Sequence, residues 1–330
     1  MAKVIVDRAI YRDGRRISQP RDLLGMGEAC AGGDGVAWVA LYRPTEQEFT
    51  GVAREFDLPE RSVEDAVRAH QRPKLERYGE TLFCVLRAAR YIDDAETVEF
   101  SELHVFAAQR FVVTVRHGEA PDLPALRRSL ESRPDLLRRA PVAILHAIVE
   151  RVVDDYAPVL AGVENDIDEI EDAVFGGKAE VSRRVYELSR EVIAFQRATR
   201  PLAPMLERLM GDRGVSDDER MHLGDAQDHA LRVVEQADAL RQLLQNILNV
   251  NLTLETKALN EASNAQNEEV KMISAWAAIL FAPTLVGTVY GMNFDGIPEL
   301  QWRFGYAYAL LLMVATSVTL YLVFKRRRWI

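Results

Sequence analysis

The residues best suited to handling a metal cation lie in and before the short stretch "VYGMNFDGIPEL" at residues 289–300. This stretch connects two apolar runs and carries the side-chain oxygens of one Asn, one Asp and one Glu. The positions that could face a pore are small or neutral: Asn267, Ala277, Thr284, Thr288, Gly291 and Asn293. Such a lining cannot remove the water shell of Mg²⁺, which dehydrates reluctantly. Its oxygens can instead accept hydrogen bonds from a hydrated ion, and symmetry would repeat one Asn as a ring.

The two apolar runs predict a pair of membrane spans. Residues 272–290, "MISAWAAILFAPTLVGTVY", and residues 306–324, "YAYALLLMVATSVTLYLVF", each contain 19 residues without a charge. A bilayer core needs about 20 apolar residues of helix. We therefore expect a first, pore-lining span, an external loop over 291–305 and a second span. The alternative is a buried helix pair in a soluble core, but the charge-free length and the flanking residues favour the membrane.

The charges that flank the two runs predict their orientation. Four consecutive cations, "KRRR", begin a basic tail over residues 325–330, and Lys271 precedes the first run. The connector has Arg303 against Asp295 and Glu299. Because positively charged flanks stay inside, both termini are expected in the cytoplasm of a cell-membrane protein, with the connector outside.

The composition and the missing motifs argue against several classes of protein. The net charge of −9 over 330 residues is unlike that of a nucleic-acid binder, which presents a broad basic face. The two cysteines, Cys30 and Cys84, form no CxxC or zinc spacing and are interpreted as reduced, structural residues. The sequence contains no G-x-x-x-x-G-K-[ST], G-x-S-x-G or H-E-x-x-H motif. We therefore expect neither an enzyme nor an organic cofactor.

The N-terminal part of the chain, residues 1–216, is predicted to be a cytoplasmic α+β domain. Runs rich in Val, Ile, Phe and Tyr between turn residues predict strands. These runs cover residues 4–14, 35–44, 81–92, 98–109 and 110–118. Helical patterns occupy 45–56 and 59–70, and helical periodicity replaces the strand signal from about Asp122. The expected architecture is a mixed sheet flanked by helices.

A long helix is predicted between this domain and the first span. Residues 225–282 contain no Gly or Pro in 58 positions, so we assign a stalk helix to 217–271 that continues into the membrane. A helix of 58 residues is about 87 Å long. Its predicted apolar stripe consists of Leu231, Val234, Leu240, Leu243, Leu244, Ile247 and Leu248. An isolated helix of this length needs partners for such a stripe, which predicts oligomerisation.

Several short motifs resemble those of the CorA family of divalent-cation channels. "YGMNF" at residues 290–294 resembles the family signature at the outer end of the first span, and "FDGIPEL", "WRFGY" and the basic tail follow in the family's order. "HQRPK" at residues 70–74 adds a match in the N-terminal domain. The resemblance covers nearly the whole chain. It implies a homopentamer in a lipid bilayer that passes Mg²⁺, often with Co²⁺ or Ni²⁺, passively under the membrane potential.

The resemblance also implies roles for residues around the pore. The outer entrance would be formed by Gly291, Met292 and Asn293, with Glu299 helping to attract cations. Asn293 would supply the ring that holds hydrated Mg²⁺. The full predicted lining is Asn267, Val270, Ile273, Ala277, Phe281, Thr284 and Thr288. Within it, Val270 and Ile273 fall where the family usually has bulky apolar gate residues.

Closure by cytoplasmic Mg²⁺, bound between adjacent subunits, is a further implication of the resemblance. Asp65, with its neighbour Glu64, matches one of the carboxylates that bind the regulatory ion. Asp225, in "DAQDHA", matches the other. The physical logic is that unscreened carboxylates across an interface repel one another, and a divalent ion relieves the repulsion.

Three other functions are compatible with parts of the sequence. A zinc transporter of the ZntB type belongs to the same superfamily, but its members typically carry a different residue in place of Met292. A membrane-anchored sensor or scaffold would use the hairpin only as an anchor and would not need the Gly-Met-Asn turn. A soluble metal-dependent enzyme would need a cluster of metal ligands, which the sequence lacks.

Overall fold

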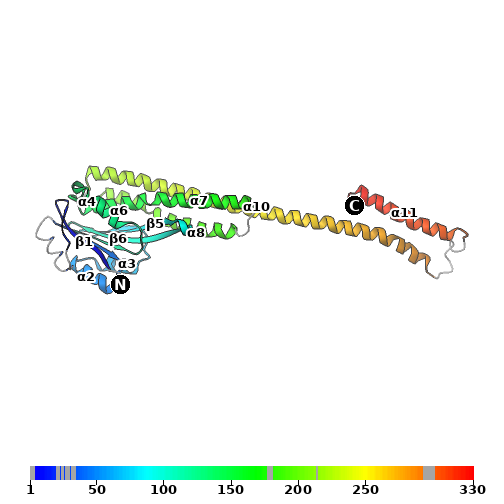
Figure 1. The fold of residues 1–330 in the computed structure, drawn as a ribbon, viewed down its shortest axis with the longest axis horizontal. Coiled ribbons are helices and arrows are strands. Elements are labelled where there is room, and N and C mark those ends of the chain that lie inside the picture. Colours follow the sequence, from blue (N-terminus) through cyan, green and yellow to red (C-terminus); the bar gives the residue numbers. More distant parts are fainter. Residues whose placement is uncertain are drawn as a thin grey trace. The chain divides into compact units, whose positions relative to one another are not determined.

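The structure is a computed structural model (Figure 1). It describes residues 4–19, 23, 26, 30, 35–176, 181–212, 215–292 and 302–330. The chain divides into two compact units, Met1–Asn249 and Val250–Ile330, and each is described by itself.

The first unit is built on one mixed β-sheet. Its strands are β1 (Ile5–Arg12), β2 (Arg15–Ser18), β3 (Val36–Tyr42), β4 (Lys74–Tyr78), β5 (Thr81–Ile92), β6 (Thr97–Ala108) and β7 (Phe111–Arg116), with a short 3-10 helix, η1 (Asp93–Ala95), between β5 and β6. The strand order is β2-β1-β3-β7-β6-β5-β4. β3 and β7 run parallel, and the other neighbouring pairs run antiparallel.

Two strands have no counterpart among the predicted runs, and both lie at the edges of the sheet. β2 is "RRIS", with every residue exposed, and β4 is "KLERY", with three charged residues. Charged edge strands protect a sheet against pairing with other chains. The apolar alternation that identifies a strand from sequence is therefore weak in both.

Helices cover both faces of the sheet. α2 (Glu46–Glu55) and α3 (Glu60–Arg68) cover one face, where Phe49 and Val52 pack with strand residues such as Phe106. The other face is covered by α4 (Leu123–Glu131), α5 (Pro134–Leu137), α6 (Val142–Asp154), α7 (Tyr156–Phe175), α8 (Val181–Thr199), α9 (Leu202–Met210) and the first part of α10 (Asp217–Tyr290).

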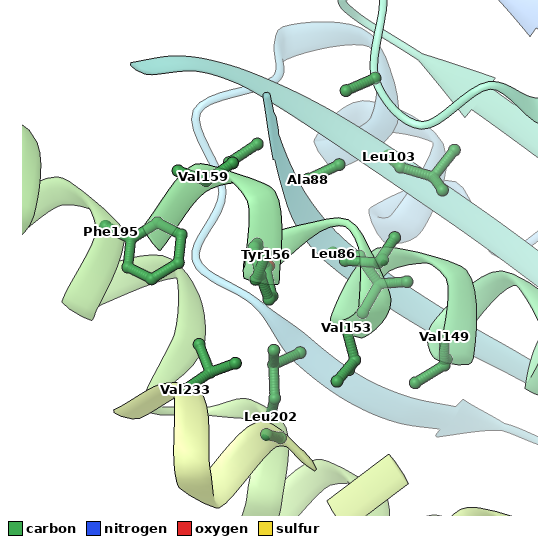
Figure 2. Packing of buried hydrophobic residues seen from close by; sticks show 14 of the residues in the cluster. Leu86, Ala88, Leu103, Val149, Val153, Tyr156, Val159, Phe195, Leu202 and Val233 are labelled. Carbon is green, nitrogen blue, oxygen red and sulfur yellow. The ribbon is translucent and has the colours of Figure 1, made fainter. Parts of the chain in front are cut away.

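Tyr156 connects three elements within the larger of the two cores. Its hydroxyl donates a hydrogen bond to the backbone carbonyl of Arg87 in β5 at 2.6 Å. Its ring meets that of Phe195 in α8 edge-on, with the centroids 5.2 Å apart. Figure 2 shows Tyr156 among Leu86, Val159 and Phe195. Because the ring is buried and the hydroxyl is satisfied, the residue fixes α7 against both β5 and α8.

The first part of α10 packs on this core through a narrow stripe. Its buried residues recur every three or four positions: Leu223, Ala226, Ala230, Val233, Ala237, Leu240, Leu244 and Ile247. The predicted stripe is only partly correct, since Leu231 and Leu243 are exposed. The physical reason is that alanines occupy much of the buried face, so the stripe of large apolar residues does not coincide with it.

In the second unit, α10 continues to Tyr290 and α11 (Gly305–Arg326) follows. Residues 252–274 of α10 are all exposed. Both helices contain a stretch long and apolar enough to cross a membrane, and these stretches are 11% and 0% buried. The core helices of a soluble protein would be mostly buried, so the soluble-core alternative does not fit them.

The predicted fold class is confirmed. The chain has a mixed sheet flanked by helices, a long helix over Asp217–Tyr290 and a C-terminal helix, and these two helices are consistent with two membrane spans.

We expect His146 to make the stability of the first unit sensitive to acid. Its ring is buried in α6, and burial lowers its pKa to about 4. The unfolded chain takes up a proton near pH ~6.5, whereas the folded chain does so only near its lowered pKa. The free energy of unfolding is therefore unaffected above pH ~6.5. It decreases as the pH falls from there toward the folded-state pKa of about 4. The full loss is on the order of 3 kcal/mol, and His146→Leu should abolish it.

Chemical unfolding of the purified protein at pH 7 and pH 5 measures this effect. The wild type should lose about 2 kcal/mol more than His146→Leu on acidification to pH 5. His229→Leu is the control, because His229 is also a histidine of the first unit and is exposed on α10. Equal acid sensitivity of wild type and His146→Leu would contradict the prediction.

Candidate functional site

The predicted pore residues share one face of α10. Their spacing of three or four positions places Asn267, Val270, Ile273, Ala277, Phe281, Thr284 and Thr288 in one row. All are exposed except Ala277, which is half-buried. Ile273 is 68% exposed and Phe281 is 71% exposed. In the single chain the row is thus uncharged and open.

α11 packs against another face of α10. Ala275 and Ile279 of α10 are buried, and the ring of Trp276 lies 6.4 Å from that of Tyr321 in α11. At about 100° of rotation per residue, the two buried positions point roughly half a turn away from the predicted pore row. α11 therefore covers one side of α10 and leaves the row on the other side exposed.

Pro283 interrupts the hydrogen-bond ladder of α10 on the side of α11. A proline has no N–H, so the carbonyl of Ile279, four residues earlier, loses its helical donor. Ser317 of α11 donates its hydroxyl to that carbonyl at 3.4 Å. An unsatisfied backbone carbonyl is costly in lipid. Ser317 therefore compensates for the proline and links the two helices.

We expect Ser317→Ala to weaken the association of α10 and α11. The change leaves the Ile279 carbonyl without this donor, and the expected loss is about 1 kcal/mol, typical of a hydrogen bond between membrane helices. Unfolding of the purified protein by SDS in mixed micelles measures it. Thr319→Ala is the matched control, because Thr319 donates to the Ala315 carbonyl within α11. Equal losses in the two variants would refute this role of Ser317.

The two threonines of the predicted row present acceptor oxygens. Thr284 donates its hydroxyl to the Phe281 carbonyl at 2.7 Å, and Thr288 donates to the Thr284 carbonyl at 2.8 Å. Because each hydroxyl proton is engaged within the helix, the oxygen retains lone pairs that can accept a hydrogen bond from water. Such oxygens suit the water shell of a cation.

α10 ends directly before the Gly-Met-Asn motif. Tyr290 is its last residue, and the N–H of Gly291 bonds back to the last turn of the helix at 2.9 Å. Met292 is 44% exposed. Asn293, the predicted ring residue, and Glu299, the predicted cation-attracting acid, lie outside the described residues.

The predicted regulatory acids belong to helices on opposite faces of the sheet. Glu64 and Asp65 lie on α3, and Asp225 is an exposed residue of α10. Within one chain the sheet separates α3 from α10. Among the described residues, no group of three or more His, Cys, Asp or Glu is arranged to hold a metal ion. An ion bound by both Asp65 and Asp225 would therefore need two chains.

Asp65 is not the unscreened carboxylate that the sequence suggested. Its Oδ2 accepts a hydrogen bond from Lys74 Nζ at 2.9 Å, and the same ammonium group binds Glu76 at 2.9 Å. Burial lowers the pKa of Lys74, but its bonds to the two carboxylates outweigh burial and leave the pKa raised. Glu64 pairs with Arg68 at 2.7 Å on the exposed surface, where an ion pair contributes little. The last residue of "HQRPK" thus neutralises a predicted metal ligand.

The turn after α3 has a backbone conformation that ordinary residues avoid. Ala69 has φ 54° and ψ −164°, and His70 has φ 66°. These values favour glycine, and each such residue costs about 1–3 kcal/mol. Glu102 of β6 binds the next residue, accepting the N–H of Gln71 at 3.0 and 3.1 Å. No sequence motif signals Glu102, because only the strand pairing brings it to the turn.

The fold and the site together define a class of membrane protein, in which an α/β unit is followed by two apolar helices and the first carries an uncharged row with acceptor oxygens. The family described as "CorA-like Mg2+ transporter protein" has a model that matches residues 33–326, and the chain belongs to this family. The resemblance drawn from the motifs is thereby confirmed.

Known proteins agree with this assignment. The chain is 25% identical over 301 residues to the cobalt/magnesium transport protein CorA of Thermotoga maritima, a match that covers 87% of this chain and 84% of that protein. The complete structure of the CorA magnesium transporter from Methanocaldococcus jannaschii matches with a TM-score of 0.71 at 17% identity, over 100% of both chains. The ZntB cytoplasmic domain from Vibrio parahaemolyticus matches with a TM-score of 0.55 at 13% identity, over 67% of this chain and 88% of that domain.

The two structural matches show the fold alone at these identities, whereas the family model carries the function. The family is one of membrane transporters for divalent cations. The chain is accordingly a divalent-cation transporter of the membrane, and this family is not one of enzymes.

Proposed function

We propose that the chain is the subunit of a homopentameric channel for passive, membrane-potential-driven uptake of Mg²⁺, with Co²⁺ or Ni²⁺ as further substrates. The observation that carries the proposal is the uncharged row on α10, exposed on the face away from α11. Copies packed around one axis would bring their rows together as a pore. The exposed segment over residues 252–274 supports such an assembly, because a long helix needs partners for stability.

A neutral pore of this kind suits a hydrated ion. Mg²⁺ holds its octahedral water shell tightly, and hydroxyl or amide oxygens do not replace it. The oxygens of Thr284 and Thr288 would accept hydrogen bonds from the waters of the shell. Asn293 would add a ring of amide oxygens at the outer entrance. Glu299 would raise the local concentration of cations there.

The inner part of the row would provide the gate. Val270 and Ile273 are apolar and exposed in the single chain. Apolar constrictions close a pore by excluding water. Asn267 would form a polar ring at the inner end, where ions leave the narrow part.

We place both termini in the cytoplasm. The cations of the tail after α11 are exposed. The end of the tail is held against the helix, since the ring of Trp329 stacks on that of Phe324 with the centroids 5.4 Å apart and the planes 12° apart. The positive-inside rule assigns such a basic tail to the cytoplasmic side.

Cytoplasmic Mg²⁺ would close the channel by binding between adjacent subunits. Asp65 of one subunit and Asp225 of the next would supply the carboxylates, with Glu64 nearby. Lys74 already compensates the charge of Asp65 within the chain. An incoming ion would have to displace this ammonium group, so the site would be weak and would fill only when internal Mg²⁺ is abundant.

A zinc transporter of the ZntB type is the alternative substrate assignment. The fold does not decide between the two, because a ZntB domain shares it. Met292 in the Gly-Met-Asn motif favours Mg²⁺. Uptake measured with each ion alone and in competition separates the two assignments.

We expect Asn293→Ala to reduce Mg²⁺ uptake into proteoliposomes by at least about tenfold, equivalent to ~1.4 kcal/mol of lost stabilisation of the passing ion. The physical reason is that the variant removes every amide oxygen of the entrance ring. A fluorescent Mg²⁺ indicator inside the vesicles measures the flux.

Asn264→Ala is the matched control, because Asn264 is an exposed asparagine of α10 that points away from the predicted row. Equal flux in wild type and Asn293→Ala would refute the entrance ring. A wild type without flux of any divalent ion would favour the anchor-only alternative, and preference for Zn²⁺ would favour the ZntB type.

We expect the double substitution Asp65→Ala with Asp225→Ala to raise the internal Mg²⁺ concentration that halves the current by about tenfold or more, since both charged ligands of the hard cation are lost. Patch-clamp recording against internal Mg²⁺ measures it. The matched control is Glu60→Ala with Asp228→Ala, which removes one exposed acid from each of the same two helices. Unchanged inhibition in the Asp65 and Asp225 variant would contradict the regulatory site.

A further inference from the structure

We propose that Glu102 is a positioning residue, whose carboxylate holds the turn after α3 and thereby places the regulatory acids of that helix. The inference rests on the proposed closure by internal Mg²⁺, because it concerns how Asp65 and Glu64 reach the geometry that such a site needs. It adds a residue from a different element, β6, to that mechanism.

The carboxylate of Glu102 is nearly buried and fully engaged. Its side chain is 11% exposed. Both oxygens accept the backbone N–H of Gln71, at 3.0 and 3.1 Å, and Oε1 also accepts a hydrogen bond from the buried ring of His104 at 2.7 Å. Burial raises the pKa of Glu102, but these hydrogen bonds outweigh it and leave the pKa lowered, so the group is an anion at neutral pH.

Asp65 contacts both ends of the turn that Glu102 holds. The backbone carbonyl of Asp65 accepts the N–H of Ala69 at 3.2 Å, and its carboxylate accepts Lys74 Nζ at 2.9 Å. Gln71, which Glu102 binds, lies between these two contacts. A movement of Gln71 would therefore be transmitted to both ends of the turn, and so to the backbone and the side chain of Asp65.

A second residue next to Glu102, His117, also holds α3. His117, the residue after β7, donates its Nε2 proton to the carbonyl of Ala66 at 2.8 Å. The backbone N–H of His117 donates to the backbone carbonyl of Glu102 at 2.9 Å. Glu102 of β6 and His117 after β7 are thus hydrogen-bonded to each other, and they bind Gln71 and the last turn of α3 respectively.

The turn needs this anchor because it is strained. Ala69 and His70 both have positive φ although neither is glycine. A strained conformation persists only where the surroundings over-determine it. When the contact to Gln71 is weakened, the two residues can relax toward ordinary backbone angles, and the last turn of α3 and Lys74 shift with them.

Glu102→Gln tests the inference with little change in side-chain volume. The amide keeps one acceptor oxygen and turns the other into a donor, so it cannot hold Gln71 and His104 as before. We expect the internal Mg²⁺ concentration that halves the current to rise by about tenfold, the usual effect of losing a group that orients metal ligands. The current without internal Mg²⁺ should stay at the wild-type level. Amide hydrogen exchange of residues 69–72 should become faster.

Glu99→Gln is the matched control on the same strand. Its carboxylate pairs with Arg90 at 2.6 Å, and its side chain is 43% exposed. This variant should leave both the half-inhibiting concentration and the amide exchange of residues 69–72 unchanged.

A rescue distinguishes positioning from a general loss of stability. Glycine adopts the backbone angles of Ala69 without strain. Ala69→Gly added to Glu102→Gln should therefore return the half-inhibiting concentration most of the way to that of Ala69→Gly alone. Asp13→Gly added to Glu102→Gln is the comparison, because it relieves a positive φ in the turn between β1 and β2 rather than after α3. A gain in general stability would restore the half-inhibiting concentration there as well, whereas positioning by Glu102 predicts no rescue.

The outcomes separate this inference from the proposed function. Unchanged exchange in Glu102→Gln overturns the inference, because Glu102 would then not hold the turn. Faster exchange with an unchanged half-inhibiting concentration also overturns it, because the turn would not place the acids. A wild type that ignores internal Mg²⁺ overturns the proposed regulation, and faster exchange in Glu102→Gln would then support only the hold on the turn.

Discussion

Lipid offers no hydrogen bonds, so every backbone carbonyl in a membrane span needs a donor from protein. Pro283 withdraws the helical donor from the Ile279 carbonyl, and Ser317 of α11 supplies another. This constraint helps to fix which side of α10 meets α11. The uncharged row on which the proposed pore depends lies on the side away from that contact. The hydrogen bond from Ser317 to the Ile279 carbonyl thus helps to leave the uncharged face of α10 uncovered.

The sheet imposes a comparable constraint on the first unit. It separates the helix that carries Asp65 from the helix that carries Asp225. A regulatory ion shared by these two residues requires a second chain, so sensing and assembly would depend on one another. Lys74 would have two roles in the proposed regulation, because it pairs with Asp65 in the single chain and would compete with the ion for that carboxylate.

Much of the fold could be predicted because its signals are local. Charge-free runs identify the two apolar helices, and the alternation of apolar residues identifies the central strands. The edge strands β2 and β4 could not be found, because their charged residues serve an exposed edge rather than a core. The register of the α10 stripe was partly wrong because alanine gives a weak hydrophobic signal.

The candidate site divides in the same way. The row from Asn267 to Thr288 follows from helical spacing along one segment. The pairing of Asp65 with Lys74 and the contact of Glu102 with Gln71 depend on a turn and on a strand distant in sequence, so no motif reveals them. Asn293 rests on the motif alone, since it lies outside the described residues.

The alanines of the buried stripe determine the entropic cost and the closeness of the contact between α10 and the core of the first unit. Ala226, Ala230 and Ala237 have no side-chain rotamers to restrict, so fixing this face against the core costs little side-chain entropy. Their small size also lets the backbone of α10 approach its neighbours closely. The close contact also leaves no space for a larger side chain, since even one added methylene would overpack it. Docking of α10 therefore costs little entropy, but larger side chains at these three alanine positions would destabilise the contact.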